Sequence, residues 1–397
     1  KSFAYLYPLI TSNKVAVIST GTIALQEQIL DKDIPFLKQS GIRDFNAVIA
    51  KGRNNYVCKQ KLFELERTLF PGSPMKAELD ILISNLNSWD GDFANLPFQP
   101  TKELKREIES TAEDCIMSKC EFFKYNEAPF YNARKKLAKA DLIVTNHSLY
   151  LNDVISGGNV LPEHETTVFD EAHHLYNIAV HAFTVSIGRY STTKLLQKIQ
   201  KRVNHIPESI TRQIINSESK LFEWVFSFGK PLFRLYQDHN ITLNPIVVEI
   251  LDSLRELERW LEFTPINDTL FPDELLQLKA NSHRQNLLKQ LDNLKRKWKF
   301  IIGEESYFER VNWVESDSYR GFFEIKSAPL FIDKTLEQEV WSRKTGILTS
   351  ATITNNLISQ GWQSSDVNEA FSQSTGQNFS AQANQALSGG DSTKNGK

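Results

Sequence analysis

Two adjacent carboxylates at the end of an apolar run are the residues of this sequence best suited to chemistry. The octapeptide VFDEAHHL at residues 168–175 places Asp170 and Glu171 directly after Val168 and Phe169. At the end of a strand, one carboxylate can hold a hydrated Mg²⁺ on a nucleotide, and its neighbour can accept a proton from an attacking water. Two acids and two histidines that merely solvate a loop are the alternative, so this interpretation needs support from elsewhere in the chain.

The first two residues, Lys1 and Ser2, offer such support. They precede an expected helix at residues 3–10 and an expected strand at 15–20, as the closing Gly-Lys-Ser of a phosphate-binding loop continues into its helix. The lysine would contact the β- and γ-phosphates of ATP, and the serine hydroxyl would ligate Mg²⁺. The glycines of such a loop do not precede Lys1 in this sequence, and a Lys-Ser pair alone carries no weight.

Short runs rich in Val, Ile and Leu predict buried parallel strands that feed loops at their carboxyl ends. These runs lie at residues 15–20, 47–50, 142–146, 167–170 and 346–350. Two of the intervening segments are too long to be simple crossover connections. The sequence therefore predicts an α/β fold with a parallel sheet and two inserted domains.

The two insertions differ in character. The first, about 55–130, holds all three cysteines and a loop-like stretch, NSWDGDFANLPFQP, and is expected to be small and irregular. The second, about 176–321, is dominated by helical periodicity, which predicts packed helices rather than a cofactor box. Its two apolar faces are Val247, Ile250, Leu254, Leu257 and Leu261, and Leu287, Leu291, Leu294, Trp298 and Ile301.

The bulk composition describes an ordinary globular protein. Of 397 residues, 24% are charged and 41% are hydrophobic, and the net charge of −2 neither indicates nor excludes nucleic-acid binding. No run approaches the ~18 apolar residues of a spanning helix, and the first residues lack a signal-peptide pattern, so a cytoplasmic protein without a membrane partner is expected. Three cysteines, an odd number, are either incidental thiols or ligands in a reducing compartment. From about residue 357 the Ser-, Gln-, Asn- and Gly-rich composition predicts a disordered tail.

An ordered series of blocks decides between these interpretations. The blocks are Lys1-Ser2, STGTIALQEQIL at 19–30, AKGRNNYVC at 50–58, the Cys115/Cys120 pair, APFYNARKKLAKADLIVTNHSLY at 128–150, DEAH at 170–173, SAPLFI at 327–332 and GILTSAT at 346–352. In this order they resemble the DinG/YoaA-type bacterial relatives of the XPD helicase, of superfamily 2, from Lys1 to about Asn356. Each block is weak alone, but their order is specific.

The resemblance implies a P-loop, RecA-like motor domain interrupted by an iron–sulfur-type insertion and a helical arch-like insertion. The implied bounds are 1–54, 131–175 and 322–356 for the motor domain, 55–130 and 176–321 for the two insertions, and 357–397 for the low-complexity tail. The implied reaction is hydrolysis of ATP with Mg²⁺, coupled to 5′ to 3′ movement along single-stranded or forked DNA in DNA repair.

The resemblance also distributes roles among residues. Lys1 and Ser2 would bind phosphate and Mg²⁺, Asp170 would hold the hydrated metal, and Glu171 would position or deprotonate the attacking water. The DNA backbone would contact Thr20, Thr22, Asn146 and His147. The nucleotide state would be transmitted between domains by His173, Thr349, Ser350 and Thr352. For each threonine in the DNA set, a hydroxyl that satisfies its own backbone is an equally good account.

The cysteines depart from the family pattern. The resemblance implies four cysteines that ligate a 4Fe–4S iron–sulfur cluster, and Cys58, Cys115 and Cys120 stand at three of the positions. The fourth position is Ala128, which has no donor atom. The alternatives are a cluster with a labile open site or with Glu127 as a ligand, a lineage that lost the cluster, a deliberate substitution, or three unrelated thiols. A weakened descendant of a cluster site is favoured.

Two basic runs and one missing block complete the expectations. Arg134, Lys135, Lys136 and Lys139 are candidates to face DNA phosphate, although such a run is usually a solvated helix face, and residues 295–297 are weaker candidates. No QxxGR-like block follows Thr352, so the second motor domain and its arginine are expected to be absent and these 397 residues to have negligible ATPase activity. The rivals are a catalytically inactive DNA-binding or scaffold relative and a nuclease-associated relative that only presents DNA. Protein partners in repair cannot be named from the sequence.

Overall fold

The computed structural model describes residues 2–112, 114–266, 274–304 and 309–350. Contacts among these residues divide the chain into two units. Unit 1 comprises the described residues of 2–52, 132–183 and 331–350, whereas unit 2 comprises those of 53–131 and 184–330. The chain passes from one unit to the other four times, so each unit is assembled from segments that are far apart in the sequence.

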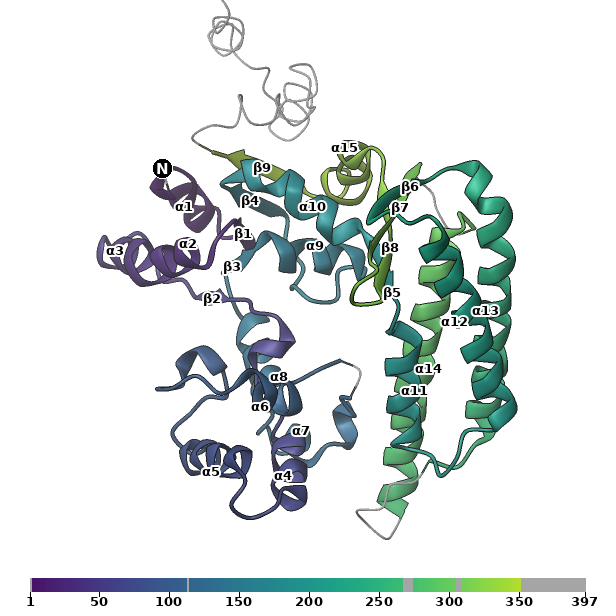
Figure 1. The fold of residues 1–397 in the computed structure, drawn as a ribbon. Coiled ribbons are helices and arrows are strands. Elements are labelled where there is room, and N and C mark those ends of the chain that lie inside the picture. The colour runs from purple at the N-terminus through teal and green to yellow at the C-terminus, as the bar shows by residue number, and fades with distance from the viewer. Residues whose placement is uncertain (1, 113, 267–273, 305–308, 351–397) are drawn as a thin grey trace, which may run out of the picture. The chain divides into compact units, whose positions relative to one another are not determined.

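Unit 1 is built on a five-stranded sheet in the order β2-β3-β1-β4-β9 (Figure 1). The strands are β1 (Ala16–Thr20), β2 (Ala47–Ile49), β3 (Leu142–Asn146), β4 (Thr166–Asp170) and β9 (Thr345–Thr349). Every neighbouring pair is parallel. The α/β fold with a parallel sheet that the sequence predicts is therefore confirmed, and each predicted strand lies within one residue of its expected bounds.

Helices cover the sheet of unit 1, and a separate apolar cluster lies on each of its faces. The helices are α1 (Ser2–Thr11), α2 (Ile23–Gln28), α3 (Ile34–Gln39), α9 (His147–Ile155), α10 (Leu175–Phe183) and α15 (Ile332–Leu336), and α8 (Pro129–Leu137) enters from unit 2. In β1, Ile18 packs with Leu6 in one cluster, and its neighbour Val17 packs with Phe169 in the other. Successive strand residues point to opposite faces, so a sheet buried on both sides requires this run of apolar residues.

The cysteine-bearing part of unit 2 is a small group of short helices. They are α4 (Lys59–Thr68), α5 (Pro74–Asn85), α6 (Lys102–Ile108) and α7 (Glu121–Lys124). Ser73 and Thr101 cap α5 and α6 with their hydroxyls, and Leu62, Leu79 and Leu104 are fully buried between the helices. Its own apolar cluster gives this segment a core.

The rest of unit 2 contains four long helices. They are α11 (Ser191–Gln200), α12 (Glu208–Ser227), α13 (Gln237–Phe263) and α14 (Glu274–Ile301) (Figure 1). Both apolar faces predicted from the sequence are buried in a single cluster, with Leu261 and Leu291 at 0% exposure and Trp298 at 2%. The predicted periodicity of α13 and α14 is therefore confirmed as core packing.

A four-stranded antiparallel sheet in unit 2 was not expected from the sequence. Its strands are β5 (Val185–Gly188), β6 (Leu232–Leu235), β7 (Arg310–Asp317) and β8 (Phe322–Pro329), in the order β5-β8-β7-β6. Helix α10 still belongs to unit 1, which the chain leaves after Phe183. Strand β8 still belongs to unit 2, which the chain leaves after Leu330. The expected bounds of the helical insertion, 176 and 321, therefore each precede the observed boundary between the units by about one helix or strand.

Across the part of the chain that the structure describes, no helix has the length and apolar character needed to cross a membrane.

Candidate functional site

The predicted site residues meet at the carboxyl edge of the parallel sheet. Thr20 is in register with Asn146 on one side and with Asp170 on the other, and Asp170 is in register with Thr349. One row of last strand residues therefore runs across β3, β1, β4 and β9. Open parallel sheets bind ligands in the crevice beyond this edge, so the row lies where a nucleotide site is expected.

The carboxylate of Asp170 is buried and fixed at both oxygens. Its exposed fraction is 5%. Oδ1 accepts hydrogen bonds from the Thr349 hydroxyl (2.9 Å) and the backbone N–H of Glu171 (3.0 Å), and Oδ2 accepts one from the Tyr5 hydroxyl (3.0 Å). A carboxylate held in this way can receive the water shell of a magnesium ion without reorienting.

Glu171 adopts a left-handed backbone conformation, with φ 54° and ψ 49°. This conformation is uncommon for a residue with a Cβ and is found at sites where the surrounding structure enforces it. It ends β4 and separates the Glu171 side chain from that of Asp170. The half-buried Glu171 carboxylate lies 3.2 Å from Nδ1 of His173. The two neighbouring acids therefore occupy different settings, as different chemical roles require.

Contacts also connect the DEAH segment to β9. Nδ1 of His173 lies 2.8 Å from the Ser350 hydroxyl, and Thr349 donates to Asp170. The structure thus brings His173, Thr349 and Ser350 together beside the carboxylate pair, and their coupling role stays a prediction. Thr352, the other residue predicted for this role, lies outside the described residues.

Three residues of this site were missed by the sequence reasoning. A Cβ on Gly21 would lie 2.8 Å from the His174 ring, so a larger residue at this position of the STGT segment would require the His174 side chain to shift. Tyr5 contacts Asp170 across 165 positions of the chain. Gly21 and His174 belong to quoted motifs that could have drawn attention, but no local signal identifies Tyr5 as a partner of Asp170.

Ser2 begins α1 and is half-buried. Lys1, the predicted phosphate ligand, lies outside the described residues. Because α1 also carries Tyr5, the same helix holds a candidate magnesium ligand and a contact to Asp170.

The structure corrects the prediction that Thr20 and His147 contact DNA directly, because both side chains have 0% exposure. The Thr20 hydroxyl donates to the Thr22 carbonyl (3.0 Å), and Nδ1 of His147 lies 2.7 Å from the Ser19 hydroxyl. Burial lowers the pKa of His147 to about 4, although nearby carbonyls of Glu171 and Asp170 favour its cation. Both side chains instead make hydrogen bonds within the protein at the carboxyl edge of the sheet.

Thr22 and Asn146 occupy helix N-terminal positions at the same edge. The Thr22 hydroxyl accepts from the N–H of Leu25 (3.3 Å), and the Asn146 side chain accepts from the N–H of Leu149 (2.8 Å). Thr22 is exposed and Asn146 is half-buried. Their predicted contact with the DNA backbone is sterically open, and it stays a prediction.

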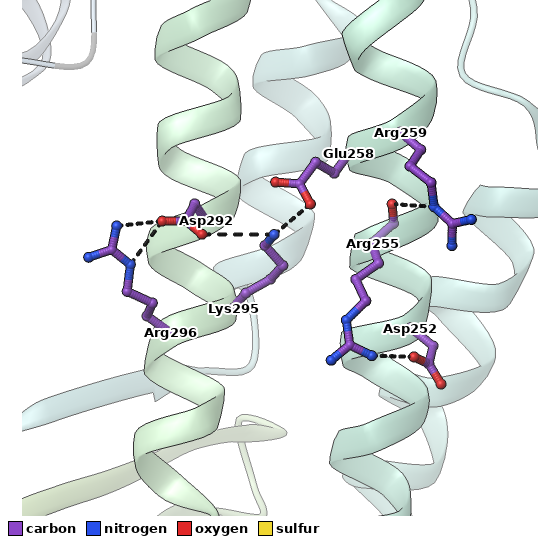
Figure 2. A network of polar contacts seen from close by, with 7 residues as sticks. All are labelled: Asp252, Arg255, Glu258, Arg259, Asp292, Lys295 and Arg296. Atoms are coloured by element: carbon purple, nitrogen blue, oxygen red, sulfur yellow. Dashed lines mark hydrogen bonds and ion pairs between the residues drawn. The ribbon is translucent and has the colours of Figure 1, made fainter. Parts of the chain in front are cut away.

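The two basic runs have different surroundings. Lys135, Lys136 and Lys139 are exposed at and after the end of α8, and Arg134 is half-buried. In the second run, Lys295 pairs with Glu258 (2.5 Å) and Arg296 pairs with Asp292 (2.8 Å), as Figure 2 shows. Acids of α13 and α14 thus compete with phosphate for Lys295 and Arg296, and a role in DNA binding for either run stays a prediction.

The three cysteines lie in the small helical segment of unit 2 and are all half-buried. Cys58 directly precedes α4, and Cys120 directly precedes α7. The Sγ of Cys115 lies 3.2 Å from the Tyr131 hydroxyl. Burial raises the pKa of the Cys58 thiol to about 11, which favours the protonated form over the thiolate that binds metals.

These residues do not fit a four-thiolate iron–sulfur cluster. Ala128 supplies no donor, and Glu127, the predicted substitute, pairs with Lys59 at 3.3 Å. Within residues 2–350, excepting the stretches left undescribed, no three His, Cys, Asp or Glu side chains are grouped closely enough to hold a metal ion. No step of the chemistry is therefore assigned to such a cluster.

In sequence the chain is similar to proteins named ATP-dependent DNA helicases, although no family model matches it. The relatives are DinG and YoaA proteins, which confirms the resemblance inferred from the ordered motifs. DinG of Photobacterium profundum is 28% identical over 400 residues, covering 89% of this chain and 57% of the relative. YoaA of Escherichia coli (strain K12) is 32% identical over 209 residues, 50% of this chain and 32% of the relative.

DinG of Escherichia coli (strain K12) is 28% identical over 324 residues, which cover 71% of this chain and 44% of the relative. The chain thus spans about half the length of the DinG relatives. Among solved structures, a truncated XPD aligns over 88% of this chain and 85% of its own, with a TM-score of 0.44 and 15% identity.

Proposed function

We propose that unit 1 is the first motor domain of an ATP-dependent DNA helicase that couples ATP hydrolysis to movement along single-stranded DNA. The proposal rests on the carboxylate pair at the end of β4. Asp170 is held at both oxygens, and Glu171 is separated from it by a left-handed backbone. The names of the sequence relatives, ATP-dependent DNA helicases, support the same assignment.

In this proposal the two acids have distinct tasks. Asp170 would hold a hydrated Mg²⁺, while Lys1 would contact the phosphates and Ser2 would ligate the ion. Magnesium, when bound with ATP, neutralises charge on the β- and γ-phosphates. Glu171 orients the attacking water and accepts its proton, and His173, Thr349 and Ser350 report the nucleotide state through their contacts with the two acids.

In this proposal, single-stranded DNA would bind along the exposed side of the carboxyl edge of the parallel sheet. Thr22 and Asn146 would approach its backbone, and the exposed Lys135, Lys136 and Lys139 would supply positive charge. We further propose 5′ to 3′ polarity, a second motor domain that supplies an arginine to the transferred phosphoryl group, and action in the cytoplasm. Unwinding of duplexes with a 5′ tail, but not of those with a 3′ tail, is the measurement that decides polarity.

The proposed role of the Glu171 carboxylate as the acceptor of the proton is tested with Glu171→Gln in the full-length polypeptide that carries this sequence. We expect the DNA-stimulated kcat for ATP to fall about 100-fold or more, with ATP binding retained, because the amide cannot accept the proton. The matched control is Glu165→Gln, since Glu165 is an exposed acid directly before β4 whose carboxylate pairs with Lys14 at the surface. The control should stay within about twofold of the wild-type kcat.

A catalytically inactive DNA-binding or scaffold protein is the second candidate. It is favoured by the cysteine segment, in which a functional metal centre of the family does not fit. If the wild-type protein binds DNA but hydrolyses no ATP, and Glu171→Gln changes nothing, the scaffold function replaces the motor function.

A further inference from the structure

Tyr5 occupies an inward-facing position on α1, three residues after Ser2. Its exposed fraction is 6%, and its ring belongs to the apolar cluster that holds α1 against the sheet, with Leu6, Leu9 and Ile18. A phenylalanine would satisfy this packing equally well. The hydroxyl therefore needs an explanation of its own, because burying a polar group is unfavourable unless it is hydrogen-bonded.

The partner of that hydroxyl is the carboxylate of Asp170. Tyr5 donates to Oδ2 at 3.0 Å, whereas the two donors at Oδ1 come from Thr349 in β9 and the Glu171 backbone. The torsion that orients an aspartate carboxylate is broad, so a single donor leaves its plane poorly defined. Donors on opposite oxygens, supplied by separate elements, restrict that torsion.

The hydrogen bond from the Tyr5 hydroxyl has a carboxylate as its acceptor. A charge-assisted hydrogen bond of this kind is stronger than one between neutral groups, so its loss should be felt by the Asp170 side chain.

We propose that Tyr5 is a positioning residue for the magnesium ion: its hydroxyl sets the plane of the Asp170 carboxylate and ties that carboxylate to the helix that begins at Ser2. The two groups that would hold the ion, Ser2 at the start of α1 and Asp170 at the end of β4, are thereby kept in a fixed position relative to each other. This inference rests on the proposed function of the Asp170 site.

The test is Tyr5→Phe in the full-length polypeptide, with Tyr150→Phe as the matched control. Tyr150 is also a tyrosine buried in unit 1, at 2% exposure, but its hydroxyl accepts from Thr167 at 3.3 Å and makes no contact with Asp170. Binding of a fluorescent ATP analogue is measured while Mg²⁺ is titrated, and Mn²⁺ is followed by electron paramagnetic resonance as a probe of the metal itself.

We expect Tyr5→Phe to raise the half-saturating Mg²⁺ concentration about tenfold, as loss of an outer-shell contact does at metal sites, and to weaken Mn²⁺ binding in parallel. Nucleotide binding without metal should not change. A Mg²⁺ dependence equal to that of wild type, or an equal shift in Tyr150→Phe, overturns the positioning role and leaves the proposed function intact. Absence of Mg²⁺-dependent nucleotide binding in the wild type overturns both.

Thr349→Val provides a second variant that does not touch the packing of α1. Because Thr349 and Tyr5 restrict the same carboxylate from opposite oxygens, Thr349→Val should also raise the half-saturating Mg²⁺ concentration. The double variant should show less than the product of the two single effects, since the first loss already frees the torsion. A fully multiplicative double variant contradicts the shared mechanism.

Discussion

At the scale of single residues, the backbone of Glu171 decides how two adjacent acids acquire separate tasks. A continued strand would alternate their side chains across the sheet, with both remaining in its ladder. The left-handed conformation at Glu171 instead ends β4 at Asp170 and turns the next side chain toward His173. Holding a non-glycine residue there costs about 1–3 kcal/mol, which the surrounding contacts must offset. The strain is therefore located at the residue that we propose positions water.

His147 gives unit 1 a pH dependence with a defined sign. Its pKa is lowered to about 4 by burial, so the folded state binds fewer protons than the unfolded state between pH 4 and the unfolded pKa of about 6.5. Stability from neutral His147 is complete above that range and is lost as pH falls through it. Between pH 7 and pH 5 we expect a loss of about 2 kcal/mol in the free energy of unfolding, measured with urea.

The assignment of this loss to His147 is tested by substitution. His147→Gln should unfold with a shallower pH dependence over the same interval, whereas His181→Gln, at an exposed position of α10, should keep the wild-type dependence. Identical pH dependences for wild type and His147→Gln would mean that the imidazole is not held neutral by burial.

Sequence alone could identify the residues that end the central strands. Asp170, Asn146 and Thr349 each follow an apolar run, and parallel strands bring such ends to one edge. It could not tell that Thr20 and His147 point inward, because hydroxyl and imidazole groups suit either a phosphate or a buried hydrogen bond. Nor could it find Tyr5, whose bond to Asp170 depends on the packing of α1.

At the scale of elements, the two ends of the cysteine-bearing segment are held together by side-chain contacts that need no metal ion. The Arg53 guanidinium lies over the Phe130 ring, with 4.1 Å to its centroid, and donates to the Tyr131 hydroxyl at 3.3 Å. These contacts join the start of the segment to its end, 77 positions later at Phe130, and Tyr131 also contacts Cys115. The planar, forked guanidinium suits stacking and hydrogen bonding together, which an ammonium group cannot match.

Arg53→Lys should therefore loosen this segment although it retains the charge. Loss of stacking and of directed hydrogen bonds should destabilise it by about 1–3 kcal/mol, observed as faster limited proteolysis between residues 53 and 131. Arg106→Lys is the matched control, since Arg106 is exposed on α6 and its replacement should leave the cleavage rate unchanged. If wild type and Arg53→Lys are cleaved at the same rate, contacts other than those of Arg53 hold the ends of the segment together.

The elements of unit 2 also mark the limit of periodicity as a guide. Helices α13 and α14 were predictable because their apolar residues recur every three or four positions. Strands β7 and β8 were missed because polar residues interrupt them: Asn312, Glu315 and Lys326 occupy ladder positions, and Lys326 pairs with Glu315 across the strands at 2.7 Å. An antiparallel sheet with one polar face gives only a short alternating signal, which the long helical stripes obscure.

At the scale of the whole molecule, the two units are interleaved along the chain but have separate cores. Two apolar clusters lie within unit 1, on opposite faces of its sheet, and two lie within unit 2, one for each of its segments. None of these four clusters combines described residues of both units. Separate cores allow separate cooperative transitions even when the chain crosses between units repeatedly.

Nucleotide should therefore stabilise one unit selectively. A ligand that binds only the folded state, at 100 times its dissociation constant, stabilises that state by about 2.7 kcal/mol, or about 100-fold in the exchange rate of amides released by its unfolding. With Mg²⁺ and ATP, we expect slower hydrogen exchange in β1, β4 and β9 of unit 1, and unchanged exchange in α12 and α13 of unit 2. Asp170→Asn is the control, because it should abolish the protection when Mg²⁺ is present.

Equal protection of both units against exchange would instead show that they unfold as one cooperative body. Protection of unit 2 alone would mean that the nucleotide does not bind at the carboxylate pair.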